Sequence, residues 1–267
     1  MRALSLFFLV AAARPAMADA LAITVGDSIV QTYSPDQYPW IQGWGADVQK
    51  HFLPAIRWEN DARGGQSTKS FVDQGLWAST LAAGPQFVLI QLGTNDWNPD
   101  PAYHTDPDTT YRTYLHQMIL DARAIGAEPI LVTPTAMRYT MPDGIHVERP
   151  STTEPWASAM AAQAADDGVA VIDMQNWTLD TYDSLGMPTA QALYGFTIPG
   201  TETPDILHFS PYGANQAAQM VVNRLPAASP SLALYLATST VPALPAPAAA
   251  VLVAALGLVV VRRSMRA

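Results

Sequence analysis

The chain has 267 residues, of which 49% are hydrophobic and 14% are charged, so it can form one large domain with a substantial core. All 23 acidic residues lie between the two terminal segments, and that body holds nine lysines and arginines, which gives it a net charge of −14. Such a surface repels phosphate backbones, so we expect no nucleic-acid partner. Because the chain has no cysteine, disulfides, thiolate catalysis and cysteine-bound zinc are excluded.

Residues 1–18 are typical of a secretory signal peptide. Arg2 precedes an apolar run from Leu4 to Val10, and small residues follow at Ala16 and Ala18. We therefore expect export, with cleavage near Ala18 or Ala20.

The body is predicted to contain alternating strands and helices. Apolar, strand-like runs occupy residues 21–26, 55–60, 86–92, 128–133 and 169–174, and helix-like segments occupy residues 44–52, 69–82, 110–125, 155–167 and 213–225. This alternation favours an α/β fold with a parallel sheet covered on both faces, in one domain over residues 19–227. Two long stretches, residues 136–153 and 180–204, are expected to be irregular and to line a site.

The carboxyl terminus is predicted to contain a tether and an apolar helix. Residues 228–245 form a linker rich in alanine, serine and proline, residues 246–261 an apolar membrane or sorting helix, and residues 262–267 a basic tail. The run from Ala248 to Val261 has no polar side chain but is short for a spanning helix, which needs about 20 residues. A buried terminal helix is the alternative.

This terminus resembles the PEP-CTERM-type sorting signals of exported bacterial envelope proteins, with a proline-containing start at residues 241–245, an apolar helix and an arginine cluster. Arginines after the helix tend to stay in the cytoplasm, which leaves the body outside. We expect a periplasmic or cell-surface protein, tethered to the membrane unless the tail is trimmed. The oligomeric state stays open.

Four polar blocks follow strands or precede helices in the body. Gly26-Asp27-Ser28 ends the first strand, residues 60–67 follow the second, Gly93-Thr94-Asn95-Asp96 follows the third, and residues 205–210 precede the last helix. Because the carboxyl ends of parallel strands share one edge of a sheet, we expect the four blocks to converge there.

These blocks contain serine, histidine and aspartate, which are the residue types that nucleophilic catalysis needs. A serine hydroxyl becomes reactive when an imidazole takes its proton, and a carboxylate fixes the tautomer of that imidazole. We predict that Asp205 and His208, three residues apart at a turn entering a helix, reach Ser28 together. The alternative for Ser28 is an ordinary helix N-cap, and the same Asp-x-x-His spacing also occurs at residues 143–146.

Two further residues can stabilise a developing oxyanion. Gly65 can offer a backbone N–H where a side chain would obstruct approach, and Asn95 can offer a side-chain amide. Alternatively, Gly65 lies in a plain turn and Asn95 only caps backbone groups. His51, His104 and His116 are expected to be surface or packing residues, and no cluster has the spacing of metal ligands.

The four blocks and their order resemble the SGNH (GDSL-type) hydrolase superfamily over residues 21–225. The resemblance implies Ser28 as nucleophile, Asp205 and His208 as its triad partners, and an oxyanion hole made by the N–H groups of Ser28 and Gly65 and the Asn95 side chain. It also implies a three-layer α/β/α sandwich with a five-stranded parallel sheet in flavodoxin-like order.

Within the superfamily, residues 64–71 and 205–214 look most like the rhamnogalacturonan acetylesterase branch. Two positions differ from that branch: Gln66 stands where it usually has arginine, and Thr94 where it usually has histidine.

The sequence therefore predicts an exported serine esterase that removes acyl groups, with O-acetyl on a carbohydrate as the first choice, and that needs no cofactor. The alternatives are a lipase, lysophospholipase or thioesterase on the same scaffold, and a non-catalytic envelope protein that binds glycans. Tryptophans are candidates for stacking on sugars, although a core role is expected for most of them: Trp40, Trp44, Trp97, Trp156 and Trp177.

Overall fold

The structure is a computed structural model, and it describes residues 19–137, 151–186, 189–196 and 204–237. The predicted signal peptide and the predicted membrane helix both lie outside these residues. Over the described ranges, no helix is both long enough and apolar enough to cross a membrane.

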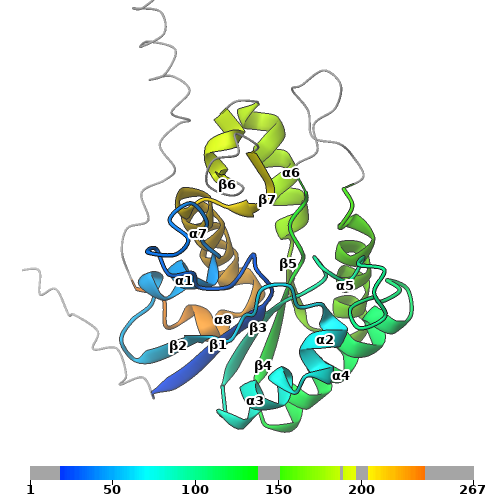
Figure 1. Ribbon diagram of the computed structural model, residues 1–267. Helices are drawn as coiled ribbons and strands as arrows, with labels where there is room; N and C mark the ends of the chain where they lie inside the picture. Colours follow the sequence, from blue (N-terminus) through cyan, green and yellow to red (C-terminus); the bar gives the residue numbers. More distant parts are fainter. Residues whose placement is uncertain (1–18, 138–150, 187–188, 197–203, 238–267) are drawn as a thin grey trace, which may run out of the picture.

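A five-stranded parallel sheet forms the centre of the molecule (Figure 1). The strand order is β2-β1-β3-β4-β5, which is the flavodoxin-like order, so the predicted fold class is confirmed. The strands are β1 (Ala20–Gly26), β2 (Ile56–Asn60), β3 (Phe87–Gln91), β4 (Glu128–Val132) and β5 (Ala170–Ile172). Two of the three inner strands, β1 and β3, are buried at every position, which is why their sequences are largely apolar and do not alternate.

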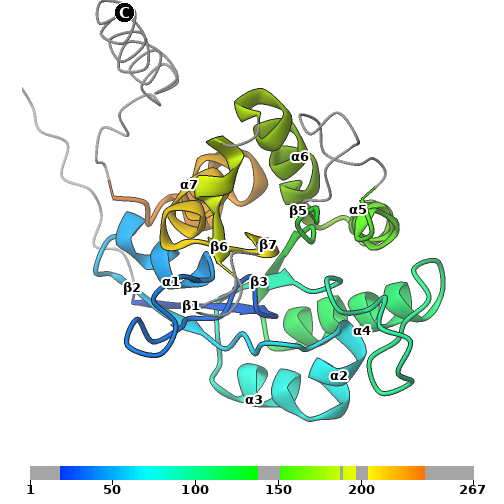
Figure 2. The same cartoon turned by 45° about the horizontal axis from the view of Figure 1, so that its top comes forward.

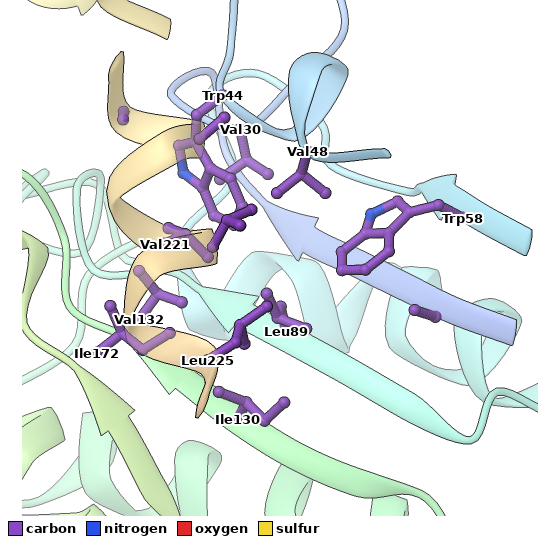
Figure 3. Packing of buried hydrophobic residues seen from close by; sticks show 14 of the residues in the cluster. Val30, Trp44, Val48, Trp58, Leu89, Ile130, Val132, Ile172, Val221 and Leu225 are labelled. Carbon is purple, nitrogen blue, oxygen red and sulfur yellow. The ribbon is translucent and has the colours of Figure 1, made fainter. Parts of the chain in front are cut away.

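Short helices and one long helix cover the first face of the sheet (Figure 2). They are α1 (Gly45–Val48), the 3-10 helix η1 (Gln49–His51), α7 (Pro211–Ala228) and α8 (Pro230–Ala233). Trp44 from α1's start packs with Leu89 of β3 and Val221 of α7 in one apolar cluster (Figure 3). This layer ties the segment after Ser28 to the helix that follows His208.

Four helices cover the opposite face: α2 (Thr68–Asp73), α3 (Leu76–Ala82), α4 (Thr110–Ala124) and α5 (Glu154–Asp167). The sequence predicts one helix over residues 69–82, but the structure has two. The break falls at Gly75, whose φ of +76° is left-handed and does not fit an α-helix.

The described parts of the stretch 180–204, which are residues 180–186, 189–196 and 204, are more regular than the sequence indicates. Helix α6 (Met174–Leu185) begins at an Asp173 side chain that accepts the Asn176 N–H, and η2 (Thr189–Leu193) follows. Then β6 (Tyr194–Phe196) pairs antiparallel with β7 (Pro204–Phe209). Figure 1 shows this hairpin between α6 and α7, away from the main sheet.

The domain extends past its predicted end at residue 227. The Ser229 side chain caps α8, and Leu232 is fully buried in the core. The Leu53 N–H then donates to the Tyr235 carbonyl at 2.8 Å, and the Ala237 N–H donates to the His51 carbonyl at 2.9 Å. Residues 228–237 therefore belong to the folded body and not to a linker.

Candidate active site

Ser28 lies in a tight turn directly after β1. The Asp27 carbonyl accepts the Val30 and Gln31 N–H groups, and the Asp27 side chain accepts the Ile29 N–H at 2.9 Å. A Cβ at Gly26 would lie 2.4 Å from a Val30 methyl and 2.7 Å from the Gln91 carbonyl oxygen, so only glycine fits before this turn. The turn fixes the Ser28 hydroxyl at the carboxyl edge of the sheet.

Asp205 and His208 lie on β7, where a bulge brings their side chains together. The pair Tyr194–Phe209 and the pair Phe196–Pro204 leave four residues on β7 opposite one on β6. Within the bulge, Asp205 Oδ1 accepts the Leu207 N–H at 2.8 Å and the His208 N–H at 2.9 Å. On a regular strand, two residues three apart would point to opposite faces. The Asx-type turn interrupts this alternation, so the Asp205 and His208 side chains can meet.

The structure joins Ser28, His208 and Asp205 in one chain of hydrogen bonds. His208 Nε2 is 2.9 Å from Ser28 Oγ, and His208 Nδ1 is 2.8 Å from Asp205 Oδ2. Burial acts to raise the pKa of the Asp205 carboxyl, but hydrogen bonds from His208 and the charge of His208 outweigh it and leave that pKa lowered. Asp205 is thus ionised at neutral pH and accepts from the imidazole.

The Asn95 side chain and the Gly65 turn lie side by side. Asn95 Nδ2 donates to the Gln66 carbonyl at 3.0 Å, which uses one of its two N–H groups and leaves the second. Gly65 is exposed, with a φ of +77°, and a Cβ built on the preceding Gly64 would come within 3.7 Å of Ser28 Cβ. The turn therefore lies next to the serine.

Asp96 holds the turn that contains Asn95 in place. Its carboxylate accepts the Thr68 N–H at the start of α2 and the Thr105 hydroxyl at 2.7 Å. Burial raises the pKa of Asp96 to about 7, and the hydrogen bonds from Thr105 and Thr68 act against that rise. Since Asp96 follows Asn95 directly, these bonds hold the third block against the second.

The two positions that differ from the acetylesterase branch do not disturb these contacts. The Gln66 side chain accepts the Ser70 hydroxyl at 2.7 Å and donates to Gln74 at 3.2 Å, so it is bound to α2. Thr94 is fully buried. Asp27 is also fully buried, and burial raises its pKa to about 6, whereas the hydrogen bond from the Ile29 backbone acts in the opposite direction.

Three histidines lie away from Ser28. His104 is exposed, His116 pairs with Asp167 across α4 and α5, and His51 follows α1. The second Asp-x-x-His copy, residues 143–146, falls outside the described residues. Among those that are described, no three histidine, aspartate or glutamate side chains form a group suited to a metal ion.

The five tryptophans differ in exposure. Trp44 and Trp156 are buried in the two cores, and Trp97 is 45% exposed. Trp40 and Trp177 are half-buried.

The sequence analysis missed two polar residues near Ser28, Gln31 and Gln42. The Gln31 side chain accepts the Gly64 N–H, so it joins the serine turn to the glycine turn. Gln42 holds the Tyr33 backbone through its side chain, and its own N–H donates to the Phe209 carbonyl at 3.0 Å. Only their nearness to Ser28 along the chain offered a signal.

The site defines a serine hydrolase. A serine, a histidine and an aspartate are joined by hydrogen bonds at the carboxyl edge of a doubly wound sheet, and a glycine turn and an asparagine amide lie beside them. The comparisons make the class specific. The model of the GDSL-like Lipase/Acylhydrolase family matches residues 24–216, so the chain belongs to this family of ester hydrolases.

Curated relatives cover most of the body. A probable rhamnogalacturonan acetylesterase, YesY of Bacillus subtilis, is 33% identical over 199 residues, which is 73% of this chain and 88% of that protein. The rhamnogalacturonan acetylesterase RhgT of the same organism is 32% identical over 206 residues, or 73% of this chain and 85% of that protein. The predicted family and its acetylesterase branch agree with these matches.

The fold also matches solved structures. A catalytic mutant of Axe2, an acetylxylan esterase from Geobacillus stearothermophilus, superposes with a TM-score of 0.57 over 78% of this chain and 94% of that chain, at 18% identity. At this identity the likeness supports the fold alone.

Proposed function

We propose that this protein is an exported serine esterase that removes O-acetyl groups from a polysaccharide. The observation that carries the proposal is the 2.9 Å contact between Ser28 Oγ and His208 Nε2, in a histidine whose other nitrogen is held by Asp205. The names of the curated relatives, a probable and a named rhamnogalacturonan acetylesterase, support acetyl as the acyl group and a polysaccharide as its carrier.

The reaction starts at the serine hydroxyl. His208 Nε2 takes the hydroxyl proton while Ser28 Oγ bonds to the ester carbonyl carbon, and Asp205 stabilises the imidazolium that forms. The resulting oxyanion is stabilised by the backbone N–H groups of Ser28 and Gly65 and by the second N–H of the Asn95 amide. These donors are fixed before substrate arrives, so little reorganisation is needed.

The tetrahedral intermediate then collapses. The bond to the sugar oxygen breaks, and His208 gives its proton to that oxygen, which leaves an acetyl-serine and a free hydroxyl on the carbohydrate. Water, deprotonated by the same imidazole, attacks the acetyl-serine. Acetate departs and Ser28 regains its proton.

Export and tethering are part of the proposal, which rests for them on the sequence of the two termini, and the two ends of the folded domain leave room for both. Strand β1 begins at Ala20, so cleavage after Ala18 leaves the strand whole, whereas cleavage after Ala20 would shorten it. At the other end, Tyr235 packs on Phe87 at the start of β3, and the Ser231 hydroxyl donates to Glu128 at the start of β4. A tether after Ala237 would therefore leave the amino edge of the sheet, with Ser28 facing away from the membrane.

Two experiments test the proposal. A fluorophosphonate probe should label the wild-type protein and not Ser28→Ala, and an absence of labelling would favour a non-catalytic glycan-binding protein. A panel of acetylated polysaccharides and p-nitrophenyl esters of increasing acyl length then tests the substrate. Activity that rises with acyl length would instead indicate a lipase.

Fractionation tests the location. In a Gram-negative host, the full chain should be found with the envelope, and a chain ending after Ala237 should be released as active, soluble enzyme. Full-length protein in the cytosol with residues 1–18 still attached would contradict the export proposal.

A further inference from the structure

Three aromatic rings lie on the loop that follows Ser28. Tyr33 and Tyr38 meet edge to face with ring centroids 5.4 Å apart, and Tyr38 meets Trp40 edge to face at 6.4 Å. Edge-to-face pairs of this kind are favourable for aromatic rings and hold each ring in a defined orientation. We call Tyr33, Tyr38 and Trp40 the aromatic wall.

The loop is fixed at its base to both parts of the active site. The Gln42 side chain accepts the Tyr33 N–H at 2.8 Å and donates to the Tyr33 carbonyl at 3.2 Å. The Gln42 N–H donates to the carbonyl of Phe209, the residue after His208. Since the loop begins after Ser28 and is clamped beside His208, the wall keeps a constant position relative to the reacting atoms.

Tyr33 brings the wall next to the nucleophile. A Cβ built on Gly64 would lie 3.7 Å from Ser28 Cβ and 3.8 Å from the Tyr33 hydroxyl, so both groups border the same glycine. Burial and the charge of Asp27 raise the pKa of Tyr33 to about 12, and a hydrogen bond with Ser28 acts against that rise. The hydroxyl thus stays protonated and can donate to a bound molecule beside the serine.

The outer part of the wall is open to solvent. Tyr38 is 44% exposed, whereas Tyr33 and Trp40 are half-buried. The Tyr38 N–H donates to the Ser34 carbonyl at 2.8 Å, so this exposed ring stands on an ordered turn. An exposed and preorganised aromatic surface loses little side-chain entropy when a ligand packs on it.

We propose that the aromatic wall is the subsite for the sugar ring that carries the scissile ester. This inference rests on the proposed function and names how the same site selects a carbohydrate. A sugar ring has an apolar face of C–H groups, which packs on an aromatic ring, and a polar rim, which the Tyr33 hydroxyl can meet. A small ester without a sugar leaves most of the wall unused.

The activity test compares two acetylated oligosaccharides with one small ester that has no sugar. For the wild type, Tyr38→Ala, Trp40→Ala and Tyr38→Phe, kcat and KM are measured on an acetylated xylo-oligosaccharide, on an acetylated rhamnogalacturonan oligosaccharide and on p-nitrophenyl acetate. We expect Tyr38→Ala to raise KM by about tenfold on the oligosaccharide that the wild type prefers, and to lower kcat/KM much less on p-nitrophenyl acetate. Tyr38→Phe, which keeps the ring, should stay close to the wild type in KM.

The matched control is Tyr114→Ala. Tyr114 lies on α4, in the helix layer on the opposite face, and its hydroxyl donates to Asp73 at 3.2 Å. The Tyr114→Ala variant should leave kcat and KM unchanged on all three esters. Equal losses on the oligosaccharide and on p-nitrophenyl acetate for Tyr38→Ala, or no loss on either, would overturn the subsite.

A binding measurement separates this inference from the esterase proposal. In a Ser28→Ala background, calorimetry with the same two oligosaccharides should show binding that Tyr38→Ala weakens and Tyr114→Ala does not. Tyr38-dependent binding by a protein whose wild type hydrolyses no ester would retain the subsite and reject the esterase. Hydrolysis by the wild type together with binding that ignores Tyr38 would reject the subsite and retain the esterase.

Discussion

Asp205 Oδ2 lies 2.8 Å from His208 Nδ1, although the two residues are only three apart on one strand. The bulge in β7 makes this contact possible, and the second carboxylate oxygen of Asp205 holds the backbone of that bulge. One side chain therefore both shapes the turn and orients the imidazole.

Asp205→Asn separates these two tasks. The amide oxygen can still accept the two backbone N–H groups, but an amide N–H facing Nδ1 favours the tautomer that places the imidazole proton on Nε2, where a base is needed. We expect kcat to fall by about 10⁴-fold with a modest change in KM. Steady-state kinetics on p-nitrophenyl acetate measure this, with circular dichroism as the check on folding. A fall of less than about tenfold would contradict the role of Asp205.

Asn95→Ala removes one oxyanion donor and leaves the Gln66 carbonyl without that partner. We expect kcat to fall by about 10²-fold to 10³-fold, because the lost hydrogen bond is strongest in the transition state. Asn98→Ala is the matched control, since the Asn98 side chain accepts the Asp100 N–H on the next turn and its backbone bond to the Asn95 carbonyl is kept in the variant. Equal kcat values for the two variants would show that Asn95 does not act in the oxyanion hole.

Gly93→Ala tests the backbone that positions Asn95. Gly93 has a φ of +124°, and a Cβ there would lie 2.9 Å from the Tyr111 hydroxyl and 3.1 Å from the Pro134 ring. We expect a loss of more than about 3 kcal/mol in the free energy of unfolding, from strain and overpacking together. Gly126→Ala, with a φ of +80° and open space around it, should cost only about 1 kcal/mol. Chemical denaturation distinguishes the two.

Asp27→Asn tests the buried carboxyl beside Ser28. Its pKa is raised to about 6 in the folded protein, so the native state binds a proton that the unfolded state releases near pH 4. Wild-type stability from this group is therefore greatest at low pH and is lost as pH rises from about 4 to about 6. The free energy of unfolding of Asp27→Asn, minus that of the wild type, should rise over this window and then level off.

The expected rise is on the order of 2–3 kcal/mol, which follows from the size of the pKa change. Asp36→Asn, at an exposed position in the following loop, is the control and should show no such trend. Urea denaturation at a series of pH values measures both variants. A flat difference for Asp27→Asn would show that this carboxyl ionises as readily in the folded chain as in the unfolded one.

The sequence by itself determined the alternation of strands and helices and the residues that the four blocks contribute. Strands that are buried on both faces are mostly apolar, so β1 and β3 are visible as apolar runs in which only Thr24 and Gln91 are polar. Polar residues that follow such parallel strands lie at one edge of the sheet. This reasoning from the sequence predicted Ser28, Gly65 and Asn95 as site residues, and the family resemblance added the order of the strands in the sheet.

Only the tertiary structure decided how the parts meet. The bulge that aligns Asp205 with His208 depends on pairing with β6, and the clamp of Gln42 on the Phe209 carbonyl joins residues far apart in the chain. Packing of residues 229–237 at the amino edge of the sheet likewise depends on partners such as Leu53 and Phe87. Such contacts leave no periodic pattern, because a hydrogen bond or a ring contact between distant segments requires only one suitable residue at each end.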